Sequence, residues 1–301
     1  MFSSLLNIVL DIILVKPMGV AGAAVATVTA QTISGIICLI YMVYKYRSLG
    51  FTKEDWKLHP KYALSLCGMG IPMGLQYSIT AIGSVILQTA VNSMGETIVA
   101  AVAAGSKISM FACCPFDAMG STMATYGGQN VGARKLDRIH QGLKDCTKLG
   151  FLYSVLALIF MIIFGQKLAL LFVDAKETQL IHYIYVFLIG NAAFYTLLTL
   201  VNVVRFMIQG LGYPTFAILA GVCEMFARGI VGFFLVPAFG YICVAIASPV
   251  AWLCADLFLV PAYFYVMHRL RDKLSQKQPE KIQGSASRNT DIHYKTAEKI
   301  S

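Results

Sequence analysis

The chain opens with Asn7-Ile-Val-Leu-Asp11 and continues, past Lys16-Pro17, into Gly19-Val-Ala-Gly-Ala-Ala-Val-Ala-Thr27. Two apolar runs therefore meet at a short break that contains proline and glycine, residues that end one helix and start the next. This stretch predicts a hairpin of two apolar helices. Asp11 lies in the middle of the first run, and a carboxylate that faced lipid would cost about 2.5–3.5 kcal/mol on insertion scales. We therefore expect Asp11 to face protein or water.

The composition of the whole chain is that of a membrane protein. Of 301 residues, 57% are hydrophobic and 13% are charged, and the mean hydropathy is +0.69. Soluble domains carry about 25% charged residues. The apolar residues also form runs long enough to cross a bilayer, for which about 20 residues suffice. We predict an all-α polytopic membrane protein with eight transmembrane segments, at residues 2–15, 19–44, 62–94, 97–126, 149–173, 180–208, 216–238 and 241–267.

The net charge of +9 is distributed unevenly between the two sides of these segments. When alternate connections are assigned to opposite sides, residues 45–61, 127–148, 205–215 and 268–301 together hold 19 of the 24 lysines and arginines. Such an excess marks the cytoplasmic side of a membrane protein. We therefore predict a multi-pass protein of the plasma membrane with both termini in the cytoplasm, and we attribute the basic excess to topology instead of nucleic-acid binding.

Four parts follow from this pattern. Residues 1–45 form two helices that we interpret as the remnant of an N-terminal bundle, and residues 46–61 form a cytosolic linker. Residues 62–267 form a C-terminal bundle of six helices. Residues 268–301 are rich in basic side chains and poor in apolar ones, so we predict a disordered basic tail facing the cytosol.

An internal repeat supports the division into bundles. Sliding the chain by 221 residues places the first hairpin on the last one, pairing Leu14, Gly19, Ala26 and Ala30 with Leu235, Gly240, Ala247 and Ala251. By the same shift, the bundle at 62–267 has a counterpart that begins about 160 residues before Met1, so we expect a whole protein with two bundles of six helices. Internal repeats of this kind are typical of secondary transporters.

Several stretches resemble the multidrug and toxic compound extrusion (MATE) transporters. The cytosolic loop at Tyr126-Gly-Gly-Gln-Asn-Val-Gly-Ala-Arg134, with Asp137-Arg138, is the most specific of them. The other similar stretches are Gly70-Ile-Pro-Met-Gly-Leu-Gln-Tyr-Ser-Ile79, the hairpin at 7–27, Glu224 with Arg228, and Ser248-Pro-Val-Ala-Trp252. The first four helices of the family have no counterpart in the chain. The resemblance implies a cation-coupled antiporter that exports amphipathic or cationic drugs and toxic compounds by alternating access between two bundles.

Asn7 and Asp11 are the strongest candidates for binding a coupling cation. They are four residues apart and so share one face of a helix. A carboxylate held at low dielectric can exchange a proton or Na⁺. The resemblance implies that Thr27 adds a hydroxyl ligand, and that H⁺ or Na⁺ is the coupling ion without any cofactor or metal. An aspartate at the membrane interface near the chain start is the competing interpretation.

The second bundle contains polar residues within its apolar segments. Glu224 and Arg228 are four apart, which predicts an intrahelical ion pair, and we expect Asp256 to hold a neighbouring helix. Each uncharged polar residue could instead form a hydrogen bond between helices. The candidates for lining a substrate cavity are Gln76, Gln88, Asp117, Asn191, Tyr195, Glu224 and Arg228.

An enzyme is not predicted. The chain has no His-Glu-x-x-His, no Gly-x-Ser-x-Gly and no acidic metal cluster, and its glycine-rich loop at 127–135 lacks the ending of a phosphate-binding loop. The expected partners are an amphipathic small-molecule substrate and the lipid bilayer, with no nucleic acid and no protein partner evident. Two alternatives remain: a flippase for lipid-linked oligosaccharides, and a transport-inactive fragment that acts as a membrane packing module.

Overall fold

A computed structural model describes residues 2–45, 57 and 59–297, and it describes side chains as far as Lys273. The chain divides into two compact units, Met1–Leu64 and Ser65–Ser301, and each is described by itself. Most of the predicted linker at 46–61 lies outside the described residues.

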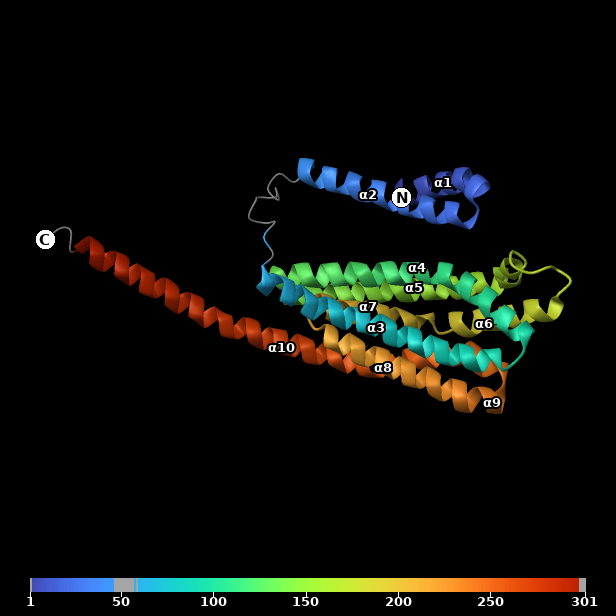
Figure 1. The fold of residues 1–301 in the computed structure, drawn as a ribbon. Helices are drawn as coiled ribbons and strands as arrows, with labels where there is room; N and C mark the ends of the chain where they lie inside the picture. Colours follow the sequence, from blue (N-terminus) through green and yellow to red (C-terminus); the bar gives the residue numbers. More distant parts are fainter. Residues whose placement is uncertain (1, 46–56, 58, 298–301) are drawn as a thin grey trace. The chain divides into compact units, whose positions relative to one another are not determined.

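The first unit contains a helical hairpin (Figure 1). Helix α1 covers Phe2–Met18 and helix α2 covers Val20–Lys45. Between them Gly19 adopts a φ of +58°, in the left-handed region that favours glycine, and its N–H donates to the carbonyl of Val15 at 2.8 Å. The hairpin predicted from the sequence is confirmed, although α1 continues three residues beyond the predicted end at Val15, because Pro17 falls in its last turn and Gly19 ends it.

Small residues hold the two helices of this hairpin close together. Gly22, Ala26 and Ala30 are the buried residues of α2. A Cβ atom added to Gly22 would lie 2.2 Å from the carbonyl oxygen of Leu14, so the backbones touch at this point. Close backbone contact is how helices associate in a bilayer, where hydrophobic burial gives no drive between them.

The second unit is a bundle of long helices (Figure 1). Helices α4, α5 and α7 pack against one another, and α10 packs against α6, α7 and α8. The elements are α3 (Pro60–Asn92), α4 (Glu96–Gly132), α5 (Leu136–Ala169), α6 (Thr178–Ala192), α7 (Tyr195–Gly210), α8 (Pro214–Ile230), η2 (Val231–Leu235), α9 (Val236–Phe239) and α10 (Tyr241–Ala297).

The count of membrane spans agrees with the prediction in part. Six described helices are long and apolar enough to cross a bilayer, and the bent pair α6–α7 makes a seventh if it is one span. The predicted eighth span is α1, which has 17 residues. The all-α, polytopic class is confirmed.

The segment predicted at 180–208 is two helices and not one. Helices α6 and α7 meet at an angle of 51° across Ala193 and Phe194. The side chain of Asn191 donates to the carbonyl of Phe187 at 2.9 Å and to that of Ala245 on α10 at 3.3 Å. A side-chain amide that binds the backbone in this way competes with regular helix hydrogen bonds, which explains a break without proline.

Two further elements differ from the sequence prediction. The segment predicted at 216–238 contains a π-helical turn, η2, between α8 and α9. Helix α10 continues through Ala297, where we predicted a disordered tail. Extending an existing helix needs no new nucleus, and the lysine, glutamate and glutamine residues of this stretch have favourable helix propensity.

Candidate functional site

A polar cavity of about 500 Å³ opens in the second unit between three helices. Helix α3 contributes Gln76, α4 contributes Asp117, and α7 contributes Asn202 and Arg205. The remaining lining residues are Tyr77, Ala118, Ser121 and Phe206. A hollow that combines charged groups, amides and aromatic rings within an apolar bundle is the usual form of a ligand site between helices.

Asp117 places a carboxylate at the wall of this cavity. It follows Pro115 by two residues on α4, and its side chain is exposed in the second unit. The amide of Asn202 on α7 donates to its Oδ1 atom at 3.5 Å. This single long hydrogen bond leaves Asp117 with most of its accepting capacity free for another group.

Arg205 at the cavity wall forms a buried ionic cluster with two charged side chains that do not line the cavity. Arg205 of α7 donates to Oε1 of Glu224 on α8, while Nη2 of Arg228 lies 3.6 Å from Oε2 of the same glutamate. All three residues are less than 10% exposed. The predicted intrahelical pair of Glu224 and Arg228 is therefore confirmed. Arg228 also donates to the carbonyl of Thr80 on α3 at 3.3 Å, so the cluster joins three helices.

Arg205 corrects the sequence interpretation, which placed it in a cytosolic connection at 205–215. Helix α7 continues to Gly210, and Arg205 is 6% exposed. Its place in the bundle follows from Glu224, which compensates its charge. The spacing of Asn202, Arg205 and Gln209, three and four residues apart, gives a polar stripe on one face of a helix, and this signal could have identified Arg205.

Gln76 closes the cavity from the side of α3. It is 3% exposed, and its Oε1 accepts a hydrogen bond of 2.5 Å from Nε2 of Gln209 on α7. Gly221 of α8 lies beside it, because a Cβ atom there would meet Cγ of Gln76 at 3.4 Å. Of the seven predicted cavity residues, Gln76 and Asp117 line the cavity, and Glu224 and Arg228 lie directly behind it.

The other three candidates lie elsewhere. Gln88 is exposed near the end of α3 and donates to Asn92 at 2.9 Å. Asn191 forms the helix-to-helix hydrogen bond to Ala245 described above. Tyr195 is 1% exposed and packs edge-on against Phe116, with ring centroids 5.4 Å apart. The competing expectation, a hydrogen bond between helices, is met by Asn191, whereas the Gln88 bond lies within α3 and Tyr195 is placed by ring packing.

In the first unit, the structure brings two of the three predicted cation ligands together. Nδ2 of Asn7 donates to Oγ1 of Thr27 at 3.3 Å, and this hydroxyl donates to the carbonyl of Ala23 at 3.0 Å. Asp11 follows Asn7 by one helical turn, and its Oδ1 atom is buried without a hydrogen-bond partner among the described residues. The arrangement offers an amide oxygen, a hydroxyl and a carboxylate along one side of the hairpin.

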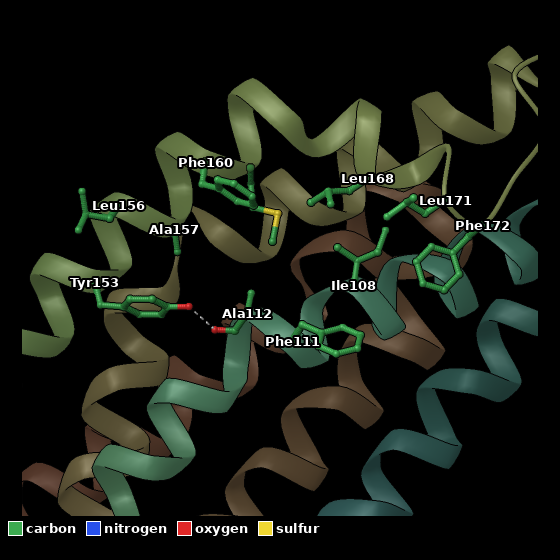
Figure 2. A pocket seen from close by; sticks show the side chains of 11 residues that line it. Ile108, Phe111, Ala112, Tyr153, Leu156, Ala157, Phe160, Leu168, Leu171 and Phe172 are labelled. Carbon is green, nitrogen blue, oxygen red and sulfur yellow. Dashed lines mark hydrogen bonds between the residues drawn. The ribbon is translucent and has the colours of Figure 1, made fainter. Parts of the chain in front are cut away.

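A second cavity, of about 590 Å³, lies between α4 and α5 and is almost wholly apolar (Figure 2). Its one tyrosine, Tyr153, points across to α4 and donates to the carbonyl of Ala112 at 2.9 Å. Around it lie the apolar side chains of Ile108, Phe111, Phe160, Leu168 and Phe172. Although this cavity is larger, it offers a ligand little polar recognition, so the polar cavity is the candidate site.

A bundle of apolar helices that surrounds a polar, charged cavity is typical of membrane transport proteins. The MatE family model matches residues 72–235, more than half of the chain, and the chain belongs to this family. The resemblance noted in the sequence is thereby confirmed, and with it the prediction that the protein is not an enzyme.

Curated relatives of the chain come from two bacteria. The "Probable multidrug resistance protein YoeA" of Bacillus subtilis (strain 168) is 22% identical over 185 residues, which are 58% of this chain and 40% of the relative. The "Probable multidrug resistance protein YpnP" of the same organism is 28% identical over 178 residues, with the same coverage. The "FAD transporter" of Shewanella oneidensis is 20% identical over 229 residues, 74% of this chain and 50% of the relative. The chain spans two-fifths to half the length of these relatives.

Solved structures share the fold. The structure titled "Crystal structure of MATE in complex with MaL6" aligns with a TM-score of 0.81 at 20% identity, covering 90% of this chain and 62% of the other. A MOP superfamily transporter from Pyrococcus furiosus, whose title reports a "reverse polarity of binding pocket", aligns with a TM-score of 0.77 at 19% identity, covering 90% and 61%. The chain therefore has the MATE fold.

Proposed function

We propose that the protein exports amphipathic, cationic compounds across the plasma membrane in exchange for an inward-moving cation. The observation that carries this proposal is the state of the charges at the polar cavity. Arg205 is bound to Glu224, whereas Asp117 accepts one long hydrogen bond and otherwise faces the cavity. The free charge at the cavity is therefore negative, which favours a cationic ligand whose apolar part lies against Tyr77 and Phe206.

The hairpin of α1 and α2 supplies the coupling site in this proposal. Asn7 and Thr27 are already hydrogen-bonded, and Asp11 lies one turn along α1 with a buried, unpartnered oxygen. Either H⁺ or Na⁺ suits a carboxylate in this setting. Alternating access between two bundles would then link the site to substrate movement, as is usual for transporters built from repeats.

An efflux assay tests the substrate class. The assay uses everted membrane vesicles across which a cation gradient is imposed. Ethidium is the cationic probe, and its uptake into the vesicles is measured. We expect Asp117→Asn to reduce ethidium transport about tenfold, the equivalent of ~1.4 kcal/mol. The matched control is Asp145→Asn on α5, whose side chain is 55% exposed and lines neither cavity. Equal transport by Asp117→Asn and the control would contradict the proposal.

An anionic substrate is the second candidate, because Arg205 also lines the cavity. FAD, the compound in the name of the Shewanella relative, is the appropriate probe. The measurement is the inhibition of ethidium transport by FAD. Inhibition that is lost in Arg205→Gln and kept in Asp117→Asn would favour this alternative. A flippase for lipid-linked oligosaccharides would need a broad basic cavity. The basic residue that lines this cavity, Arg205, is paired with Glu224, which does not favour that alternative. A packing module predicts no transport by any variant.

A further inference from the structure

Asp256 on α10 is a buried carboxylate that the polar cavity and the cation ligands do not use. The residue is 6% exposed. Both of its carboxylate oxygens are buried and have no hydrogen-bond partner among the described residues. Burying an ionised carboxylate without hydrogen bonds is very costly, and such a group responds by taking up a proton or by gaining a partner.

The position of Asp256 places it beside the ionic cluster. Helices α8 and α10 pack against each other, and the chain between them turns at Gly240, where φ is +72°. Glu224 and Asp256 are equally far from Gly240 in the sequence, so two antiparallel carboxylates lie at about the same depth. Arg205 and Glu224 are the charged groups close enough to affect Asp256 electrostatically, although neither forms an ion pair or a hydrogen bond with it.

Other ionisable groups on the packed elements are more distant. Arg228 is the next charge on α8, one turn beyond Glu224. The segments η2 and α9, with sequences VGFFL and VPAF, contain none. On α6 the ionisable residues His182, Tyr183 and Tyr185 lie toward the opposite end from Asn191, which itself contacts α10 at Ala245, more than ten residues before Asp256.

Two thiols lie close in sequence to the two carboxylates. Cys223 of α8 and Cys254 of α10 act on each other. The charged groups near Asp256 are one guanidinium and one carboxylate, and Trp252 lies one turn before it on α10.

The charges of this cluster balance in one protonation state. Arg205, Arg228 and Glu224 sum to one positive charge, so an ionised Asp256 makes the group neutral and a protonated Asp256 leaves it at +1. In the arrangement described, Nε of Arg205 is also buried without a partner. A donor and an acceptor within one cluster are thus both unused, and a rotation of either side chain could join them once Asp256 is ionised.

We propose that Asp256 is an exchangeable-proton site of the second unit, separate from Asn7 and Asp11. When Asp256 holds a proton, its neutral carboxyl group rests in apolar packing and Arg205 is bound by Glu224. When the proton leaves, Nε of Arg205 donates to the new carboxylate, and the guanidinium is shared by two acidic groups. Because Arg205 also lines the polar cavity, loss of this proton draws a cavity-wall cation toward α10. The link to substrate movement rests on the proposed function, but the proton site itself does not.

Trp252 provides a direct probe of this site. The chain has two tryptophans, so Trp56→Phe leaves Trp252 alone to report. We expect the emission of Trp252, in the full chain reconstituted into liposomes, to titrate with pH as a single proton transition. Asp256→Asn should abolish this transition. The matched control Asp145→Asn, with its exposed side chain, should keep it.

Asp256→Glu is a second test, which keeps the proposal testable if the asparagine variant fails to fold. It retains a carboxylic acid on a longer side chain, so its transition should return with a changed midpoint, and the C=O stretch of the protonated acid should move in an infrared difference spectrum. A parent protein without any transition, a transition that persists in Asp256→Asn, or an unmoved band in Asp256→Glu would each overturn the proposal. If the parent protein shows the Trp252 transition but does not export ethidium, the result contradicts the proposed function and leaves the proton site standing.

Discussion

At the scale of single residues, Glu224 is the group on which two buried cations depend. Arg205 and Arg228 both bind its carboxylate, from different helices. Charges inside a bundle are tolerated because they compensate one another, and removing one partner leaves the others buried and uncompensated. Glu224 is therefore a structural requirement of the second unit as well as a neighbour of the cavity.

Neutralising Glu224 should destabilise the protein strongly. We expect Glu224→Gln to lower the free energy of unfolding by about 3–5 kcal/mol, because two guanidinium groups lose their counter-charge. Thermal unfolding in detergent measures the change. The control is Glu96→Gln, at the exposed start of α4, which should unfold like the parent. Equal unfolding temperatures for the two variants would contradict this interpretation of the cluster.

The Gln76–Gln209 hydrogen bond should show the asymmetry of buried polar pairs. Replacing either residue by leucine leaves the other amide buried without its partner, at a cost of about 1–3 kcal/mol. The double replacement removes both polar groups, so we expect it to be less destabilising than the sum of the single replacements. A double-mutant cycle on unfolding free energies measures this coupling, and strict additivity would show that the bond contributes nothing.

At the scale of elements, the helices of the second unit are held together by close backbone contacts. A Cβ atom on Gly210 of α7 would lie 2.2 Å from the carbonyl oxygen of Ala124 on α4. On Gly150 of α5 it would lie 2.2 Å from Cγ2 of Thr199 on α7. Such contacts fix the distances between α4, α5 and α7, and hence the width of the polar cavity between α4 and α7.

Gly210→Ala should therefore force α4 and α7 apart. The added methyl group meets backbone that cannot rotate away, and overpacking of this kind costs about 1–3 kcal/mol. Thermal unfolding and ethidium export should both fall. Gly132→Ala at the end of α4 is the control, because a Cβ atom there has nothing within 4 Å. A parent-like Gly210→Ala would show that the contact is looser than its geometry indicates.

At the scale of the whole molecule, the helical class and most helix positions could be predicted because a bilayer leaves the backbone few alternatives to helix. The ion pair within α8 was also predictable, since its partners are four residues apart. Arg205 and the bend after Asn191 were not, because each depends on a partner in another helix, Glu224 in one case and Ala245 in the other. The spacing of residues in the sequence shows which side chains share a helix face. Contacts between helices form only when the helices pack, so spacing does not reveal them.

The predicted orientation of the whole chain can be tested directly. Basic connections concentrate on one side, so we expect the C-terminus to be cytoplasmic. A green fluorescent protein fused after Ser301 should fluoresce, and an alkaline phosphatase fused at the same place should be inactive. A control fusion within 174–179, the acidic connection before α6, should give the reverse result. An active phosphatase at the C-terminus would contradict the predicted topology and indicate the opposite orientation.

The π-helical turn η2 has a consequence for how this protein can change over evolutionary time. A π turn holds one residue more than an α-helical turn, so a single-codon deletion within Val231–Leu235 restores regular helix and leaves the residues beyond it facing nearly the same way. Glu224 and Arg228 precede the turn and keep their places. A lineage can thereby lose or regain one residue at this turn without disturbing the charged cluster on one side of it or the packing of the helix on the other.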